Sequence, residues 1–73
     1  MEIQEKILRE IDTECRYAEK NGTSRFSTCD HYNWDSDIWN NRQQIITGIR
    51  DRGYNVSQST NWGVLDIITT KKQ

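Results

Sequence analysis

The sequence predicts a single small α+β domain, residues 1–73, with the element order α-β-α-β-β. Two stretches carry apolar residues at helical spacing, and each of them ends at a glycine. The last third of the chain alternates apolar and polar residues, as expected of strands in a hairpin. Two helices packed on one face of a three-stranded sheet are the simplest arrangement that buries both apolar stripes.

The first helix is predicted over residues 2–21. Its apolar stripe holds Ile3, Ile7, Leu8, Ile11, Cys15 and Ala18. Acidic residues stand four positions before basic ones, as in Asp12 and Arg16, an order that stabilises a helix. Gly22 ends the helix because it takes the left-handed conformation without a Cβ penalty.

A short strand is predicted over residues 23–30, followed by one helix over residues 36–52. Asp35 is a suitable N-cap for this helix, and Asp37 lies in the first turn, where the helix dipole favours negative charge. The buried stripe holds Ile38, Trp39, Ile45, Ile46 and Ile49. Gly53 ends the helix.

A further strand is predicted to begin at residues 54–56 and another to cover residues 64–70, and the two are joined by a loop around residues 59–63. Alternation points one set of side chains towards the helices: Phe26, Thr28, Tyr54, Val56, Leu65 and Ile67. The opposite face then carries Cys29, His31, Asn55, Ser57, Val64, Asp66 and Ile68. This outer face is partly apolar, and the sheet has two open edges, so we expect a homodimer or a bound target to cover it.

The charge distribution and the absence of known motifs limit the classes of function that the chain could have. Residues 1–41 hold five basic and nine acidic residues, whereas residues 42–73 hold five basic and two acidic ones. The chain has one histidine and none of the common catalytic or nucleotide-binding motifs, so we expect no enzyme and no cofactor. No apolar run is long enough to cross a membrane, and the first residues do not resemble a secretory signal, which predicts a cytoplasmic protein.

Three side chains could hold zinc, namely Cys15, Cys29 and His31. Cys15 falls inside the apolar stripe of the first helix, where a buried thiol behaves as a small apolar group. Cys29 and His31 are expected on the far face of the sheet. We therefore predict no metal site.

The segment over residues 31–39 combines acidic and large aromatic side chains without a lysine or arginine. Aromatic residues are frequent at binding hot spots because they bury much area at low entropic cost. Trp39 is expected to pack in the core, and Trp62 is expected at the tip of the hairpin. The predicted partner-binding residues are Tyr32, Trp34, Asp35, Asp37, Arg42 and Trp62.

Arg42 has two interpretations. It falls between Ile46 and Ile49 on the helical wheel, inside the apolar stripe. Its stem could pack while the guanidinium reaches solvent. Alternatively, packing could hold the guanidinium towards a carboxylate of this chain or of a partner.

The end of the second helix resembles a known group of proteins. Arg52-Gly53-Tyr54-Asn55-Val56, a polar turn and then Leu65-Asp66-Ile67-Ile68 are similar to a pattern in small proteins encoded by bacteriophages and prophages. The similar layout extends upstream through Ala18-Glu19-Lys20-Asn21-Gly22. The resemblance implies a compact α+β module that binds and inhibits a host or defence protein, as anti-CRISPR proteins do.

The leading hypothesis is therefore a phage-encoded protein that blocks a host or defence protein in the bacterial cytoplasm. The alternative is a small nucleic-acid-binding regulator that uses the basic residues of the second half, which are Arg42, Arg50, Arg52, Lys71 and Lys72.

Overall fold

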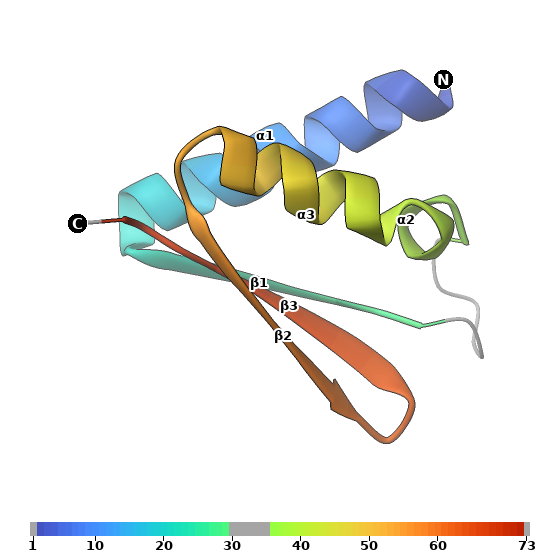
Figure 1. The fold of residues 1–73 in the computed structure, drawn as a ribbon. Helices are drawn as coiled ribbons and strands as arrows, with labels where there is room; N and C mark the ends of the chain where they lie inside the picture. Colours follow the sequence, from blue (N-terminus) through green and yellow to red (C-terminus); the bar gives the residue numbers. More distant parts are fainter. Residues whose placement is uncertain (1, 30–35, 73) are drawn as a thin grey trace.

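The computed structural model describes residues 2–29 and 36–72, and its elements follow the predicted order (Figure 1). The elements are α1 (Ile3–Asn21), β1 (Thr23–Thr28), α2 (Ser36–Asn40), α3 (Arg42–Asp51), β2 (Asn55–Asn61) and β3 (Val64–Thr70). The prediction of an α+β fold is confirmed. The predicted segments that involve His31, Tyr32, Trp34 and Asp35 lie outside the described residues.

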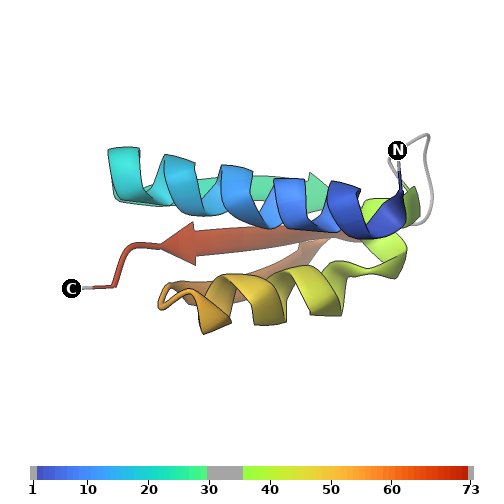
Figure 2. The same ribbon diagram turned by 90° about the horizontal axis from the view of Figure 1, so that it is seen from above.

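The three strands form one sheet in the order β1-β3-β2. β3 lies in the centre and pairs antiparallel with both neighbours, so β1 and β2 run in the same direction. Viewed from above, α1 and α3 lie side by side over the sheet, α1 along β1 and α3 along β2 (Figure 2). The α1 helix ends as predicted at Gly22, whose φ is 86° and whose N–H donates to the Ala18 carbonyl at 2.7 Å.

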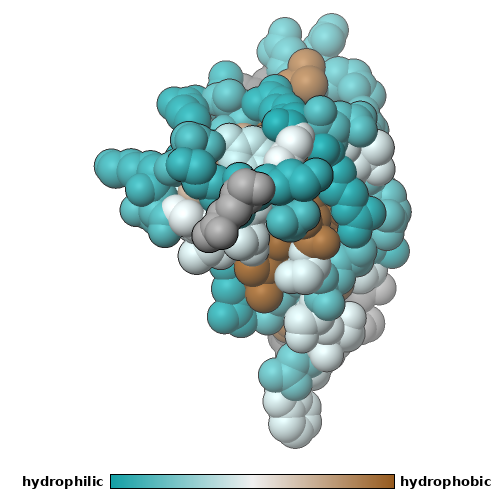
Figure 3. Space-filling model, turned by 60° about the vertical axis from the view of Figure 1, so that its left-hand side comes forward, coloured by the Kyte–Doolittle hydropathy of each residue, from teal (hydrophilic) through white to brown (hydrophobic). Residues whose placement is uncertain are grey.

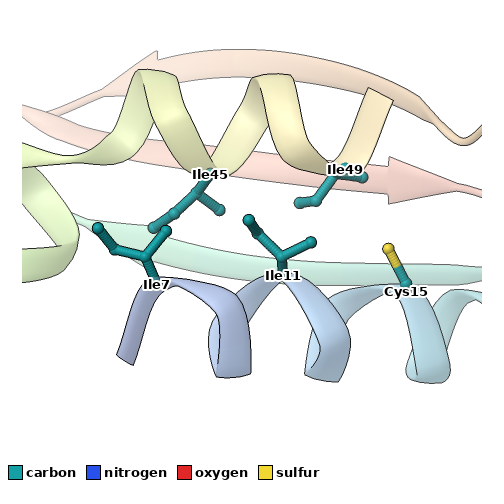
Figure 4. Close-up of a cluster of buried hydrophobic side chains, with 5 residues drawn as sticks. All are labelled: Ile7, Ile11, Cys15, Ile45 and Ile49. Carbon is teal, nitrogen blue, oxygen red and sulfur yellow. The ribbon is translucent and has the colours of Figure 1, made fainter. Parts of the chain in front are cut away.

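The core lies between the helices and the sheet. Side chains from α1 point towards side chains from α3 in one cluster, made of Ile7, Ile11, Cys15, Ile45 and Ile49 (Figure 4). A second cluster joins α3 to β3 and is made of Ile46, Leu65 and Ile67. Phe26 and Val56 pack against both clusters, so the predicted helix-facing side of the sheet is confirmed.

The helices approach closely at Gly48. A Cβ atom built there would lie 2.4 Å from the Cδ1 atom of Ile11. Only a residue without a side chain leaves α1 and α3 at this separation without moving Ile11, which is itself buried.

The prediction of one helix over residues 36–52 is wrong, because Asn41 divides it into α2 and α3. Asn41 has φ −114° and ψ 20°, and its side-chain Nδ2 donates to the Asp37 carbonyl at 2.8 Å. The Asn41 N–H still donates to the same carbonyl at 3.1 Å, so the side chain shares this acceptor with the backbone and does not replace the helical hydrogen bond. The stripe continues across the break, since Trp39 packs against the second cluster as expected.

Two smaller predictions are also wrong. The loop over residues 59–63 is only a two-residue turn, because Ser59, Thr60 and Asn61 pair with β3 and extend β2. Cys29 is not on the open face of the sheet: it follows the end of β1 at Thr28, and it is buried. Because Cys29 lies outside β1, the alternation of side chains along the strand does not determine which way its side chain points.

Candidate functional site

The candidate site is the hairpin tip, which we define as residues 61–64 at the turn between β2 and β3. In Figure 1 this end of the hairpin extends away from the layer of helices. Along β2 only Val56 is partly buried, and every residue from Ser57 to Asn61 is exposed. The α3 helix thus covers the beginning of β2 and leaves its end to solvent.

The turn itself consists of Trp62 and Gly63, with φ values of 56° and 76°. Two consecutive positive φ values characterise the tight hairpin turn whose twist matches that of the strands, and such turns favour Asn-Gly, Asp-Gly or Gly-Gly. A tryptophan is unusual there, because a left-handed residue with a Cβ costs about 1–2 kcal/mol. Trp62 is the only non-glycine residue with positive φ in the described part of the chain.

Trp62 is also 92% exposed. The next most exposed of the large apolar residues that the structure describes is Leu8, at 56%. An indole with this exposure contributes no burial to the monomer, so neither packing nor backbone preference explains why this position holds tryptophan. Costly conformations persist at binding sites, where the strain is part of the function.

Polar contacts stabilise the sheet next to the hairpin tip. On the outer face, Arg25 Nη2 donates to Asp66 Oδ2 at 2.7 Å, and the Ser27 hydroxyl donates to the other carboxylate oxygen. The hydrogen bonds from Ser27 and Arg25 hold the pKa of the Asp66 carboxyl below its ordinary value. Val64 and Ile68 are partly buried on this face. Figure 3 shows that hydrophilic residues cover most of the visible surface around a central apolar area.

Asp37 has a structural contact. Lys6 Nζ lies 3.3 Å from Asp37 Oδ2, and this ion pair connects α2 to α1. In Figure 1, α2 belongs to the helix layer, and the turn between β2 and β3 lies below it, beyond the part of the sheet that the helices cover. Asp37 thus serves a contact between helices, whereas Trp62 belongs to the hairpin tip.

Arg42 also makes its contacts within the chain. Its guanidinium carbon lies 3.9 Å from the centroid of the Trp39 ring, and Nη1 donates to the Trp39 carbonyl at 2.8 Å. Both contacts cross the break at Asn41, so Arg42 joins α2 to α3. The guanidinium is thus held by an aromatic ring and a carbonyl of its own chain.

A shallow groove lies between α1 and the connection from α3 to β2. Its walls carry paired charges: Arg52 and Arg16 bind Asp12, and the Tyr54 hydroxyl donates to Glu19, which also pairs with Lys71. Cys15 also lines this groove.

Burial raises the pKa of the Cys15 thiol, an effect that Arg52 partly offsets. The raised pKa keeps the thiol protonated at neutral pH, so Cys15 is a poor nucleophile. Among residues 2–29 and 36–72, no three His, Cys, Asp or Glu side chains are grouped closely enough to hold a metal ion.

Comparisons with known proteins leave the site to be interpreted from its own chemistry. No family model, curated protein or solved structure matches the chain. Within the described part of the chain, no helix combines the length and apolar character needed to cross a membrane.

Proposed function

We propose that this chain is a small binding protein, encoded by a phage or prophage, that inhibits a host or defence protein in the bacterial cytoplasm. It acts by occupying a surface of its target, without catalysis and without a cofactor. The hairpin tip supplies the anchor of the interface, with Trp62 inserted into a pocket of the target.

One observation carries the proposal: Trp62 is 92% exposed and has a positive φ. Both properties are unfavourable in the isolated monomer, and both favour a projecting anchor. A tight turn holds the ring on a rigid two-stranded support, so little conformational entropy is lost on binding. Tryptophan is also among the residues that most often dominate binding energy.

The contacts of the basic residues favour this proposal over nucleic-acid binding. Arg52 pairs with Asp12 and Lys71 pairs with Glu19, while Arg42 stacks on Trp39. A nucleic-acid site draws its affinity from cations that release counterions from phosphates. Cations already paired with carboxylates contribute less to such binding, because each phosphate contact then competes with an existing ion pair.

Capture from a bacterial lysate tests the proposal. The immobilised wild-type chain and its Trp62→Ala and Tyr17→Ala variants are compared, and the proteins retained by each are identified by mass spectrometry. Tyr17 is the matched control, because it is an aromatic residue on α1 that is 54% exposed.

We expect one protein to be retained by the wild type and by Tyr17→Ala but lost with Trp62→Ala. Equal retention by all three chains would contradict a role for the hairpin tip. Retention of nucleic acid in place of protein would contradict the proposal as a whole.

A further inference from the structure

The β2 strand forms one edge of the sheet, and nothing in its sequence guards that edge. It pairs with β3 without interruption from Asn55 opposite Thr70 to Asn61 opposite Val64. It contains no charged residue and no proline, although these are the usual means of preventing strand addition at an edge. Apart from the Val56 carbonyl, which accepts from the side chain of Arg50, its outward-facing backbone groups are therefore available to another strand.

The sequence around this edge reads nearly the same in both directions. Residues 53–63 are Gly-Tyr-Asn-Val-Ser-Gln-Ser-Thr-Asn-Trp-Gly, with Gln58 at the centre. The matching positions are Gly53 and Gly63, Tyr54 and Trp62, Asn55 and Asn61, Val56 and Thr60, and Ser57 and Ser59. Three of these five pairs are identical. The other two match in kind, because Tyr54 and Trp62 are both aromatic and Val56 and Thr60 are both β-branched.

We propose that β2 pairs antiparallel with β2 of a second copy, in the register centred on Gln58. An antiparallel two-fold pairing centred on one residue places each residue opposite its counterpart on the other side of that centre. The palindrome then brings like residues together along the whole edge. The product is a dimer with one continuous six-stranded sheet.

The direction of the backbone groups agrees with this register. A two-residue turn directs the carbonyl of Asn61 across the hairpin towards Val64. Backbone groups alternate along a strand, so those of Val56, Gln58 and Thr60 face away from β3. In agreement with this, Arg50 Nη2 reaches the Val56 carbonyl at 3.4 Å.

In the proposed register every outward-facing residue meets another outward-facing residue. Gln58 meets Gln58 of the second copy, and Val56 meets Thr60. Both copies can therefore exchange backbone hydrogen bonds at Gln58 and at the two Val56–Thr60 pairs, where Arg50 has to release the Val56 carbonyl. Registers that place an outward-facing residue opposite an inward-facing one lose these hydrogen bonds.

The side chains are compatible as well. Serine and asparagine each donate and accept hydrogen bonds, so they pair with their own kind, and no like charges meet. Tyr54 and Trp62 lie just outside β2, at the two ends of the paired edge, so the strand pairing does not require a contact between them.

The other edge of the sheet does not offer the same match. The β1 strand reads Thr-Ser-Arg-Phe-Ser-Thr, whose centre falls between Arg25 and Phe26. A two-fold axis there would oppose residues that point to different faces of the sheet. Arg25 is in addition bound to Asp66. Self-complementarity thus selects β2, and a second copy is the occupant that provides it.

The test compares the association of the full chain with that of Gln58→Lys. Light scattering over a range of concentrations should show the wild type moving from 8.7 kDa towards twice that mass. Gln58→Lys places two like charges opposite each other at the two-fold axis, and we expect association at least about tenfold weaker. Gln43→Lys makes the same change at an exposed position of α3 and should associate as the wild type does.

Two further measurements test the register. A mixture of Gln58→Lys and Gln58→Glu should restore the dimer, because opposite charges then meet at the axis. On oxidation, Gln58→Cys should form a crosslinked dimer and Asn61→Cys should not, since residue 61 faces residue 55 of the second copy. The two natural cysteines are buried, and they are present in both variants.

The inference is overturned if the wild type remains a monomer, if Gln58→Lys associates normally or if Asn61→Cys crosslinks as readily as Gln58→Cys. It can be judged separately from the proposed function, because Gln58→Lys keeps Trp62 and is tested with the purified chain alone. Loss of the dimer with retained capture of the target would support both conclusions.

Discussion

Replacing Trp62 by asparagine should make the folded monomer more stable. Trp62 has φ 56° and is 92% exposed, so the substitution removes a backbone penalty and loses almost no buried area. Asparagine tolerates the left-handed conformation far better than a bulky residue does. The lower end of the penalty of about 1–2 kcal/mol sets the expected gain at about 1 kcal/mol.

Urea unfolding followed by far-ultraviolet circular dichroism measures this gain. The experiment is best made in the Gln58→Lys background, where self-association does not add to the apparent stability. Thermal unfolding should show a rise of roughly 4–8 °C for about 1 kcal/mol in a domain of this size.

Trp62→Ala is the matched control. Alanine keeps a Cβ in the left-handed conformation while it removes the ring, so its stability should stay near that of the wild type. A loss of stability in Trp62→Asn would refute the reasoning, because it would show that the indole packs in the monomer.

Three further perturbations test the account of the fold. Gly48→Val should lower the free energy of unfolding by about 2 kcal/mol in chemical denaturation, because its side chain would collide with Ile11; an unchanged value would show that the helices can separate. Asp66→Asn should make the free energy of unfolding fall less steeply in acid. The lowered pKa of Asp66 stabilises the fold above about pH 4, and this contribution is lost as the pH falls through the folded-state pKa. Urea titrations at several pH values measure the decline, and an unchanged decline would contradict this reasoning. Arg42→Ala should cost about 1 kcal/mol of thermal stability by removing the stack on Trp39 and its hydrogen bond, whereas normal stability with weakened target binding would return Arg42 to the interface.

The helices and their stops were predictable from local sequence, because the signals are strong and short-range. The first helix was predicted to end at residue 21 and does so, since Gly22 adopts a left-handed conformation that residues with a Cβ atom resist. The break at Asn41 was missed because it is a local change in the backbone of one residue, with φ −114° and ψ 20°. Apolar periodicity does not report such a change, since the apolar stripe continues across it.

The existence of the hairpin was predictable from the sequence, but the length of its strands was not. Ser59, Thr60 and Asn61 have the composition of a loop, yet pairing with β3 makes them strand. Tertiary pairing of this kind outweighs local preference. The exposed position of Trp62 was predicted, whereas its left-handed backbone follows from the two-residue turn and could not be read from composition. The open edge of β2 depends on strand order, which the sequence pattern did not determine.

The most direct test of the central claim is the affinity of the hairpin tip for the captured target. Calorimetric titration of the purified target should show that Trp62→Ala binds about 30-fold more weakly than the wild type, or weaker still, which corresponds to about 2 kcal/mol at a hot spot. Tyr17→Ala should bind as tightly as the wild type. Equal affinities for Trp62→Ala and the wild type would contradict the claim that the hairpin tip anchors the interface.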